Sequence, residues 1–149
     1  MINNYSFDWI LKNKLAVSRA PTTEEHFEYL FKCGVRHILC LCNQKEVPDL
    51  LHNNRRFNFV RYELPDHKCN KLVSKDQILD VLKIIDDFYC ANGSVLVHCF
   101  AGIERSPLIC ISWMMKRENL NYINAYEYVK SVHRDTNPLQ EQLNVIKQL

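Results

Sequence analysis

Short apolar runs alternate with longer amphipathic segments along this chain, and that alternation constrains its fold more than any other feature. Residues 35–41 and 94–98 are apolar, β-prone and too short for stable helices. Residues 74–91 instead place apolar side chains at helical spacing. Strands that alternate with helices build layered α/β domains. We therefore predict a single α/β domain over residues 1–149, with a central, mostly parallel sheet flanked by helices.

The expected helices carry start and stop signals. Thr22 and Glu25 have capping-box spacing before one helix, and so do Ser74 and Gln77 before another. The first helix is expected to end at Gly34, because glycine tolerates the backbone conformation that closes a helix. The other expected elements are an extended stretch at 14–18, a strand at 58–63, and helices from Pro107, over 122–133 and over 139–149.

Composition narrows the setting. The seven cysteines are an odd number and lie within apolar runs, which predicts a reducing, cytoplasmic compartment. Residues 1–8 lack the pattern of a secretory signal, and the apolar stretch 108–115 is far shorter than a membrane span. A net charge of +2, with basic residues scattered among acidic ones, argues against a nucleic-acid partner. The oligomeric state is left open.

The junction between the predicted strand 94–98 and the helix that follows it is suited to bind phosphate. Such a loop can turn successive N–H groups inward, and the helix N-terminus adds positive potential. Gly102 permits a tight backbone path, and the planar fork of Arg105 can bind two phosphate oxygens. The candidate phosphate-binding residues are Phe100, Ala101, Gly102, Ile103, Glu104 and Arg105.

Cys99, at the start of this loop, is the candidate nucleophile. A thiol at a helix N-terminus beside a cation ionises more readily than an ordinary cysteine, and the thiolate is the reactive form. Ser106 is expected to hydrogen-bond the sulfur, and His98 to support the loop. The alternative is a core cysteine beside a surface arginine. The joint spacing of Cys99 and Arg105 at a strand-to-helix junction favours the catalytic interpretation.

Residues 98–106 match the signature His-Cys-x-x-Gly-x-x-Arg-Ser/Thr at every fixed position, so the chain resembles the cysteine-based protein tyrosine phosphatase superfamily. The segments HILCLCN, YELPDH, GSVLVHCFAGIERSP and AYEYVKSVHRD make it most similar to the small dual-specificity phosphatases, over residues 14–145. The resemblance implies hydrolysis of phosphotyrosine, with phosphoserine or phosphothreonine as further substrates, through a phosphocysteine intermediate. It implies phosphoprotein or phosphopeptide substrates and no cofactor or metal.

Ester cleavage also needs a proton for the departing oxygen, and Asp66 is the candidate general acid. It follows Pro65 after the strand 58–63, at the edge of the sheet where the phosphate loop is expected. The family's general-acid loop matches the same residue, although an aspartate after proline also makes ordinary turns. Arg134 falls where related enzymes often carry an arginine, which implies a place at the substrate rim.

Other residues leave alternatives open. Glu104 departs from the small or hydroxyl residues that are commoner there, which disfavours very acidic substrates. Cys42 ends the strand 35–41 and is a candidate redox partner for Cys99, with Cys69 as second choice. A zinc site of Cys40, Cys42, Cys69 and His67 has poor spacing. The same loop could act on RNA 5′-triphosphates or small metabolites, or bind phosphoproteins without catalysis.

Overall fold

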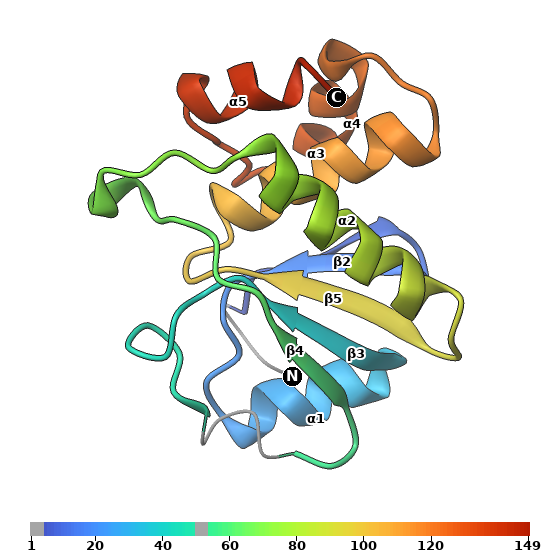
Figure 1. The fold of residues 1–149 in the computed structure, drawn as a ribbon. Helices are drawn as coiled ribbons and strands as arrows, with labels where there is room; N and C mark the ends of the chain where they lie inside the picture. Colours follow the sequence, from blue (N-terminus) through green and yellow to red (C-terminus); the bar gives the residue numbers. More distant parts are fainter. Residues whose placement is uncertain (1–4, 50–53) are drawn as a thin grey trace.

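The computed structural model describes residues 5–49 and 54–149, and its centre is a five-stranded sheet. The strands lie in the order β1-β2-β5-β3-β4 (Figure 1). Strand β1 pairs antiparallel with β2, and every other neighbouring pair is parallel, which confirms the predicted mostly parallel sheet. The bounds are β1 Phe7–Leu11, β2 Leu15–Ser18, β3 Val35–Cys40, β4 Asn58–Arg61 and β5 Ser94–His98.

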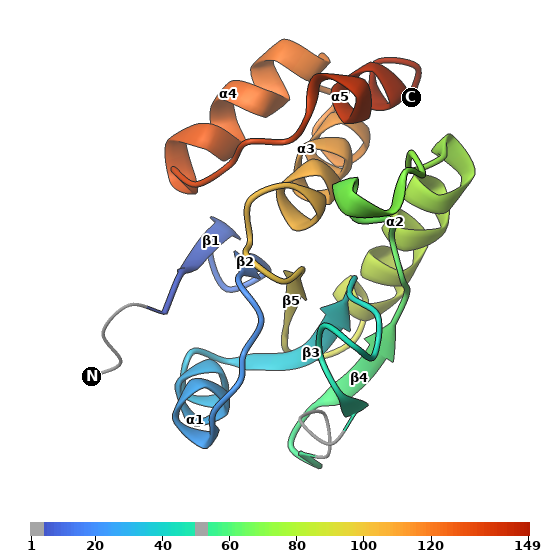
Figure 2. The same cartoon turned by 90° about the vertical axis from the view of Figure 1, so that its left-hand side faces the viewer.

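Helices cover both faces of the sheet, unequally. Among the α-helices of the described residues, α1 lies alone on one face and the other four lie on the opposite face (Figures 1 and 2). The larger apolar core lies between the sheet and those four helices, and a smaller core lies under α1. The bounds are α1 Glu24–Lys32, α2 Lys75–Tyr89, α3 Arg105–Arg117, α4 Tyr122–Val132 and α5 Gln140–Ile146.

Some predicted boundaries need correction. The side chain of Thr23, not Thr22, caps α1 by accepting a hydrogen bond from the backbone N–H of His26. Helix α3 begins at Arg105, before the predicted start at Pro107, and β4 ends at Arg61 rather than at residue 63. The capping box of Ser74 and Gln77 is confirmed, and β3 pairs in parallel with β5.

Strand β1 was not predicted, because its sequence does not alternate cleanly between apolar and polar residues. Phe7 and Trp9 pack against the smaller core, while Ile10 belongs to the larger one. Asp8 therefore occupies a strand position on the side of the larger core. Part of the N-terminal stretch used in the sequence argument, residues 1–4, lies outside the described residues.

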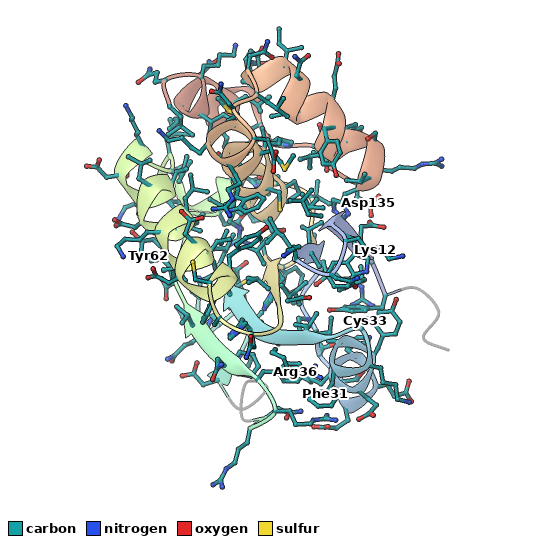
Figure 3. All side chains as sticks on the ribbon, turned by 90° about the vertical axis from the view of Figure 1, so that its right-hand side faces the viewer. Lys12, Phe31, Cys33, Arg36, Tyr62 and Asp135 are labelled. Atoms are coloured by element: carbon teal, nitrogen blue, oxygen red, sulfur yellow. The ribbon has the colours of Figure 1, made fainter. Side chains whose placement is uncertain are left out.

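Charged side chains close the rim of the smaller core. The guanidinium carbon of Arg36 lies 3.7 Å from the centre of the Phe31 ring, and Figure 3 shows the two side chains together beside α1. Such a contact lets an arginine cover apolar surface while its charge stays near water.

In the part of the chain that the structure describes, no helix combines the length and apolar character needed to span a bilayer.

The register of the parallel strands sets up the site. Ser18, His98 and Cys40 are paired neighbours at the carboxyl ends of β2, β5 and β3. The loop that follows His98 therefore leaves the middle of this edge, where ligands bind in open α/β sheets. Cys99 is the first residue of this loop, and α3 begins at Arg105, where the loop ends.

Candidate active site

The loop between β5 and α3 is held by its outward-facing carbonyl groups. Three of these oxygens accept hydrogen bonds from outside the loop: Phe100 from Ala20 N–H at 3.0 Å, Gly102 from His133 Nε2 at 2.6 Å, and Ile103 from Asn137 N–H at 2.8 Å. In a trans peptide the carbonyl and the next N–H point in opposite directions. These bonds therefore turn the N–H groups of residues 101, 103 and 104 away from the protein body, as an anion-binding nest requires.

Gly102 is the residue that lets the loop pass close to the sheet. Its φ is +73°, in the left-handed region that side chains disfavour. A Cβ atom there would lie 2.9 Å from the backbone nitrogen of Arg19 and 3.0 Å from the carbonyl carbon of Ser18. Any larger residue would push the loop away from the end of β2.

Cys99 is paired with Ser106 in the structure. The Cys99 sulfur and the Ser106 hydroxyl oxygen are 3.1 Å apart, and both residues are buried within the protein. The distance is short enough for the hydroxyl to donate to a thiolate. His98 Nδ1 lies 3.0 Å from the carbonyl oxygen of Cys99 and therefore donates to it. This bond fixes the peptide at the start of the loop.

Arg105 is held by a carboxylate that the sequence analysis missed. Nη1 and Nη2 lie 3.0 and 2.6 Å from the two oxygens of Glu46, and Nη1 also lies 3.4 Å from the carbonyl oxygens of Leu41 and Leu64. Burial alone lowers the pKa of Arg105, but the hydrogen bond to Glu46 and the negative charge that Cys99 carries as a thiolate more than reverse this and raise it. The guanidinium thus keeps its charge although only 6% of its side chain is exposed.

Within the described residues, the hydrogen bonds to Arg105 engage only Nη1 and Nη2. Glu46 binds the edge formed by these two nitrogens. The opposite edge, with Nε–H and the second N–H of Nη2, keeps the fork geometry that matches two phosphate oxygens.

A cavity of about 520 Å³ joins the predicted general acid to the phosphate loop. Asp66 lines it together with Cys99 and Arg105, as do His67 and Lys68 from the 3₁₀ helix His67–Cys69 that follows Asp66. His67 Nδ1 lies 3.0 Å from a carboxylate oxygen of Asp66 and 3.0 Å from one of Glu104. The imidazole therefore bridges the two loops that face each other across the cavity.

Other predicted residues lie elsewhere or in altered settings. Arg134 is exposed and is not among the described residues that line the cavity. Cys42 is fully buried, and its interaction with Cys40, together with burial, raises the pKa of its thiol. It therefore stays protonated and is a weak nucleophile at neutral pH. The disulfide between Cys42 and Cys99 stays a prediction.

The alternative zinc ligands do not gather at one point. Cys40 and Cys42 lie near His98 inside the protein, whereas His67 lies near Asp66 and Glu104 at the cavity. Cys69 is exposed. The structure thus divides the proposed ligand set between two places, because Cys40 and Cys42 are buried whereas His67 and Cys69 lie on the exposed 3₁₀ helix after β4.

Two contributors to the site, Glu46 and His133, were missed for the same reason. Glu46 and His133 reach the phosphate loop from 59 and 31 residues away, and nothing in the local sequence marks that contact. The place of Glu46 after the strand 35–41 was a usable signal, since that strand ends at the same edge as β5. His133 directly precedes Arg134, the residue for which the resemblance implies a place at the substrate rim.

Comparisons with known proteins agree with this geometry. The family model for the catalytic domain of dual specificity phosphatases matches residues 10–149. Human dual specificity protein phosphatases 16 and 9 are 32% and 28% identical over 112 and 113 residues, which are 74% and 76% of this chain. The matched regions are only 16% and 28% of those relatives, so the chain spans a minor part of their length.

A solved structure is similar along nearly its whole length. The crystal structure of Tk-PTP in the active form superposes with a TM-score of 0.83 at 25% identity, over 97% of this chain and 95% of that one. The family model begins at residue 10, near the end of β1, and covers the other four strands, the phosphate loop and the acid loop. The chain therefore belongs to the family of dual specificity phosphatase catalytic domains.

Proposed function

We propose that this domain is a cysteine-dependent protein phosphatase that hydrolyses phosphotyrosine and also phosphoserine or phosphothreonine. The observation that carries the proposal is the shared cavity, which Cys99, Arg105 and Asp66 all line. These three residues supply a nucleophile, a fixed cation and a proton donor, which are the parts that phosphate ester cleavage needs.

In the first step the Cys99 thiolate attacks phosphorus, and the bond between phosphorus and the ester oxygen breaks. Asp66 donates its proton to that oxygen as it leaves, so the alcohol or phenol departs neutral. The N–H groups of the loop and the free edge of Arg105 bind the three peripheral oxygens throughout. The product is a phosphocysteine and an ionised Asp66.

In the second step water attacks the phosphocysteine, and Asp66 takes up the proton that the water loses. The bond between sulfur and phosphorus breaks, and inorganic phosphate is released. Ser106 stabilises the departing thiolate through the contact of 3.1 Å. Asp66 is again protonated and Cys99 again a thiolate, so protons and electron pairs balance over one turnover.

The cavity rim supports an amino-acid phosphate over a highly charged substrate. Phe100 and Ile103, two residues of the loop, are 56% and 38% exposed and present apolar surface to a substrate side chain. Glu104 adds a negative charge to the wall, while Lys68 adds a positive one. This balance suits a single phosphate group and opposes polyanions. Arg134 is assigned to a more distant part of the peptide, outside the cavity.

The cellular setting belongs to the same proposal. All seven cysteines are free, which suits a reducing compartment such as the cytoplasm. The proposed partner is a phosphoprotein, with no cofactor. A phosphoprotein binder without catalysis is disfavoured because both Cys99 and Arg105 are retained.

The test is a substrate panel with the Cys99→Ser variant as reference. The panel holds phosphotyrosyl and phosphothreonyl peptides, phosphoinositide micelles and 5′-triphosphate RNA. We expect turnover of the peptides, abolished by Cys99→Ser, whose hydroxyl is almost wholly un-ionised at neutral pH. The variant should still bind phosphopeptide. Wild-type turnover confined to the lipid or the RNA would reassign the substrate, and substantial activity of Cys99→Ser would exclude it as the nucleophile.

A further inference from the structure

A buried histidine lies behind the phosphate loop, on the side away from the cavity. His133 follows α4, and its side chain is 0% exposed. Nε2 lies 2.6 Å from the carbonyl oxygen of Gly102, and Nδ1 lies 2.6 Å from Oδ2 of Asp8 on β1. The imidazole thus links the edge strand of the sheet to the most tightly packed residue of the loop.

Both partners of this imidazole are hydrogen-bond acceptors. A backbone carbonyl oxygen cannot donate, and the carboxylate of Asp8, whose side chain is 42% exposed, offers only acceptor oxygens. A neutral imidazole has one N–H and can satisfy only one of the two acceptors. Both contacts of 2.6 Å are satisfied when each ring nitrogen carries a proton, an arrangement that pairs an imidazolium with Asp8.

The bond to Gly102 has a direct consequence for phosphate. The carbonyl of Gly102 and the N–H of Ile103 belong to one trans peptide and point in opposite directions. Drawing the carbonyl toward His133 aims the N–H of Ile103 at the phosphate position. The pull on this carbonyl is stronger from an imidazolium than from a neutral ring, because charge-assisted hydrogen bonds are stronger.

The surrounding segment holds His133 in this place. Thr136 is buried and donates its hydroxyl to the carbonyl of His133 at 2.7 Å, and Lys130 Nζ binds the carbonyl of Thr136 at 2.8 Å. Asn137 N–H binds the carbonyl of Ile103, so the same segment contacts the loop twice. Figure 3 places the neighbouring Asp135 beside β1, at the end of α4.

We propose that His133, protonated on both ring nitrogens by virtue of Asp8, is a positioning residue that orients the Gly102–Ile103 peptide for phosphate binding. The inference deepens the proposed function, since it concerns the same loop. Unlike the proposed function, the inference does not require that the domain hydrolyse a phosphoprotein. The imidazolium and the oxyanion affinity exist whether or not the domain turns over a phosphoprotein.

The experiment compares the wild type with His133→Gln, Asp8→Asn and the control Glu127→Gln. Glu127 is an exposed residue of α4, so its variant changes charge without touching the loop. Histidine-ring NMR at neutral pH reports which nitrogens carry protons, and the signals lost in His133→Gln assign the ring. Calorimetry with orthovanadate measures oxyanion binding without turnover, and thermal unfolding shows that each variant is folded.

We expect both His133 nitrogens of the wild type to be protonated. His133→Gln should weaken vanadate binding roughly 10- to 100-fold, the range for one hydrogen bond to a charged group. Asp8→Asn removes the charge partner but leaves a side chain that can donate to Nδ1. It should make the ring neutral, keep the Nε2 bond to Gly102 and weaken binding only a few-fold. Glu127→Gln should bind as the wild type does.

Two results would overturn the proposal. One is a neutral His133 ring in the wild type, which would mean that Asp8 carries the second proton. The other is a folded His133→Gln variant that binds vanadate with the affinity of the wild type and in which vanadate shifts the NMR signal of the Ile103 amide as it does in the wild type. A protein that binds vanadate as expected but hydrolyses no phosphopeptide would contradict the proposed function and leave this inference standing.

Discussion

Two walls of the cavity, the phosphate loop and the acid loop that follows Leu64, differ in how firmly they are attached to the rest of the protein. The phosphate loop is tied to the protein body by hydrogen bonds to its carbonyl groups, by the bidentate pair of Arg105 and Glu46, and by continuity with α3. The acid loop beyond Leu64 is largely exposed, and one of its backbone bonds, from Cys69 N–H to the carbonyl of Asp66, is internal to it. Its contact with the opposite wall runs through His67.

This difference matches what each wall must do. An oxyanion site is effective when its donors are oriented before the substrate arrives, because no reorganisation is then needed during the reaction. A general acid must instead admit a bulky phosphorylated side chain and then approach the leaving oxygen. Segments with few buried contacts open at low cost in free energy. The loop that binds phosphate is therefore the firmly held wall, and the loop that carries the general acid is the lightly held one.

The largest effect on turnover is expected on the lightly held wall, at the candidate general acid Asp66. Asp66→Asn keeps the shape of the side chain but cannot donate an acidic proton, so turnover should fall roughly 10²- to 10⁴-fold. The loss should be greater for phosphothreonyl peptides than for activated aryl phosphates, since a more basic leaving oxygen needs the proton more. Turnover against pH should also lose its high-pH decline, which reports ionisation of the acid.

Asp76→Asn is the matched control, because Asp76 is an exposed residue in the first turn of α2 that does not line the cavity among the described residues. It should leave turnover within about two-fold, as surface changes usually do. If Asp66→Asn retained its high-pH limb and its turnover, the acid would have to be sought among the other carboxylates of the cavity, with Glu104 first.

The residues within the phosphate loop could be predicted from the sequence, whereas the residues that support the loop from outside could not. The phosphate loop is a contiguous motif, so Cys99, Arg105 and Ser106 could be named together and are found together. Glu46 and His133 support that loop through contacts between distant elements, which a local pattern does not encode. Strand β1 was missed for a related reason. Asp8 breaks its apolar pattern in order to reach His133.

A second prediction tests the rigid wall through Glu46→Gln. An amide oxygen accepts from Arg105 as a neutral group, which leaves a buried guanidinium without its charge partner. We expect kcat/KM to fall roughly 10- to 100-fold, the cost of one hydrogen bond to a charged group. The free energy of unfolding should fall by up to about 3 kcal/mol, less than for a fully buried pair because 19% of the Glu46 side chain is exposed.

The control is Asp49→Asn, which removes a charge from the pair of Asp49 and Arg61. That pair has a separation of 2.7 Å, similar to the shorter contact of Glu46 with Arg105, but the Asp49 side chain is 63% exposed. It should cost under about 1 kcal/mol and leave kcat/KM unchanged. Added phosphate should raise the thermal midpoint of Glu46→Gln more than that of the wild type, because it supplies the missing anion. Equal losses in the two variants would show that burial of Arg105 has no special role.

The smallest effect is expected where the two walls meet, at Glu104. Its carboxylate lies 3.0 Å from His67 Nδ1 and lines the cavity that must receive a dianion. Glu104→Gln removes a repulsive charge at a side chain that is 21% exposed, so KM for an acidic phosphopeptide should fall about two- to five-fold. KM for a matched neutral phosphopeptide should change less. Added salt should shrink the difference between the peptides, because mobile ions screen partly exposed charges.

Glu118→Gln is the control for that variant, since Glu118 follows the opposite end of the same helix and is exposed. It has the same change in net charge and should leave both KM values unaltered. A fall in kcat with Glu104→Gln, at unchanged KM, would mean that the contact of Glu104 with His67 serves chiefly to hold Asp66 over the phosphate loop. A fall in KM with little change in kcat would instead mean that the lightly held wall positions Asp66 without this contact, and that Glu104 acts by repelling acidic substrates.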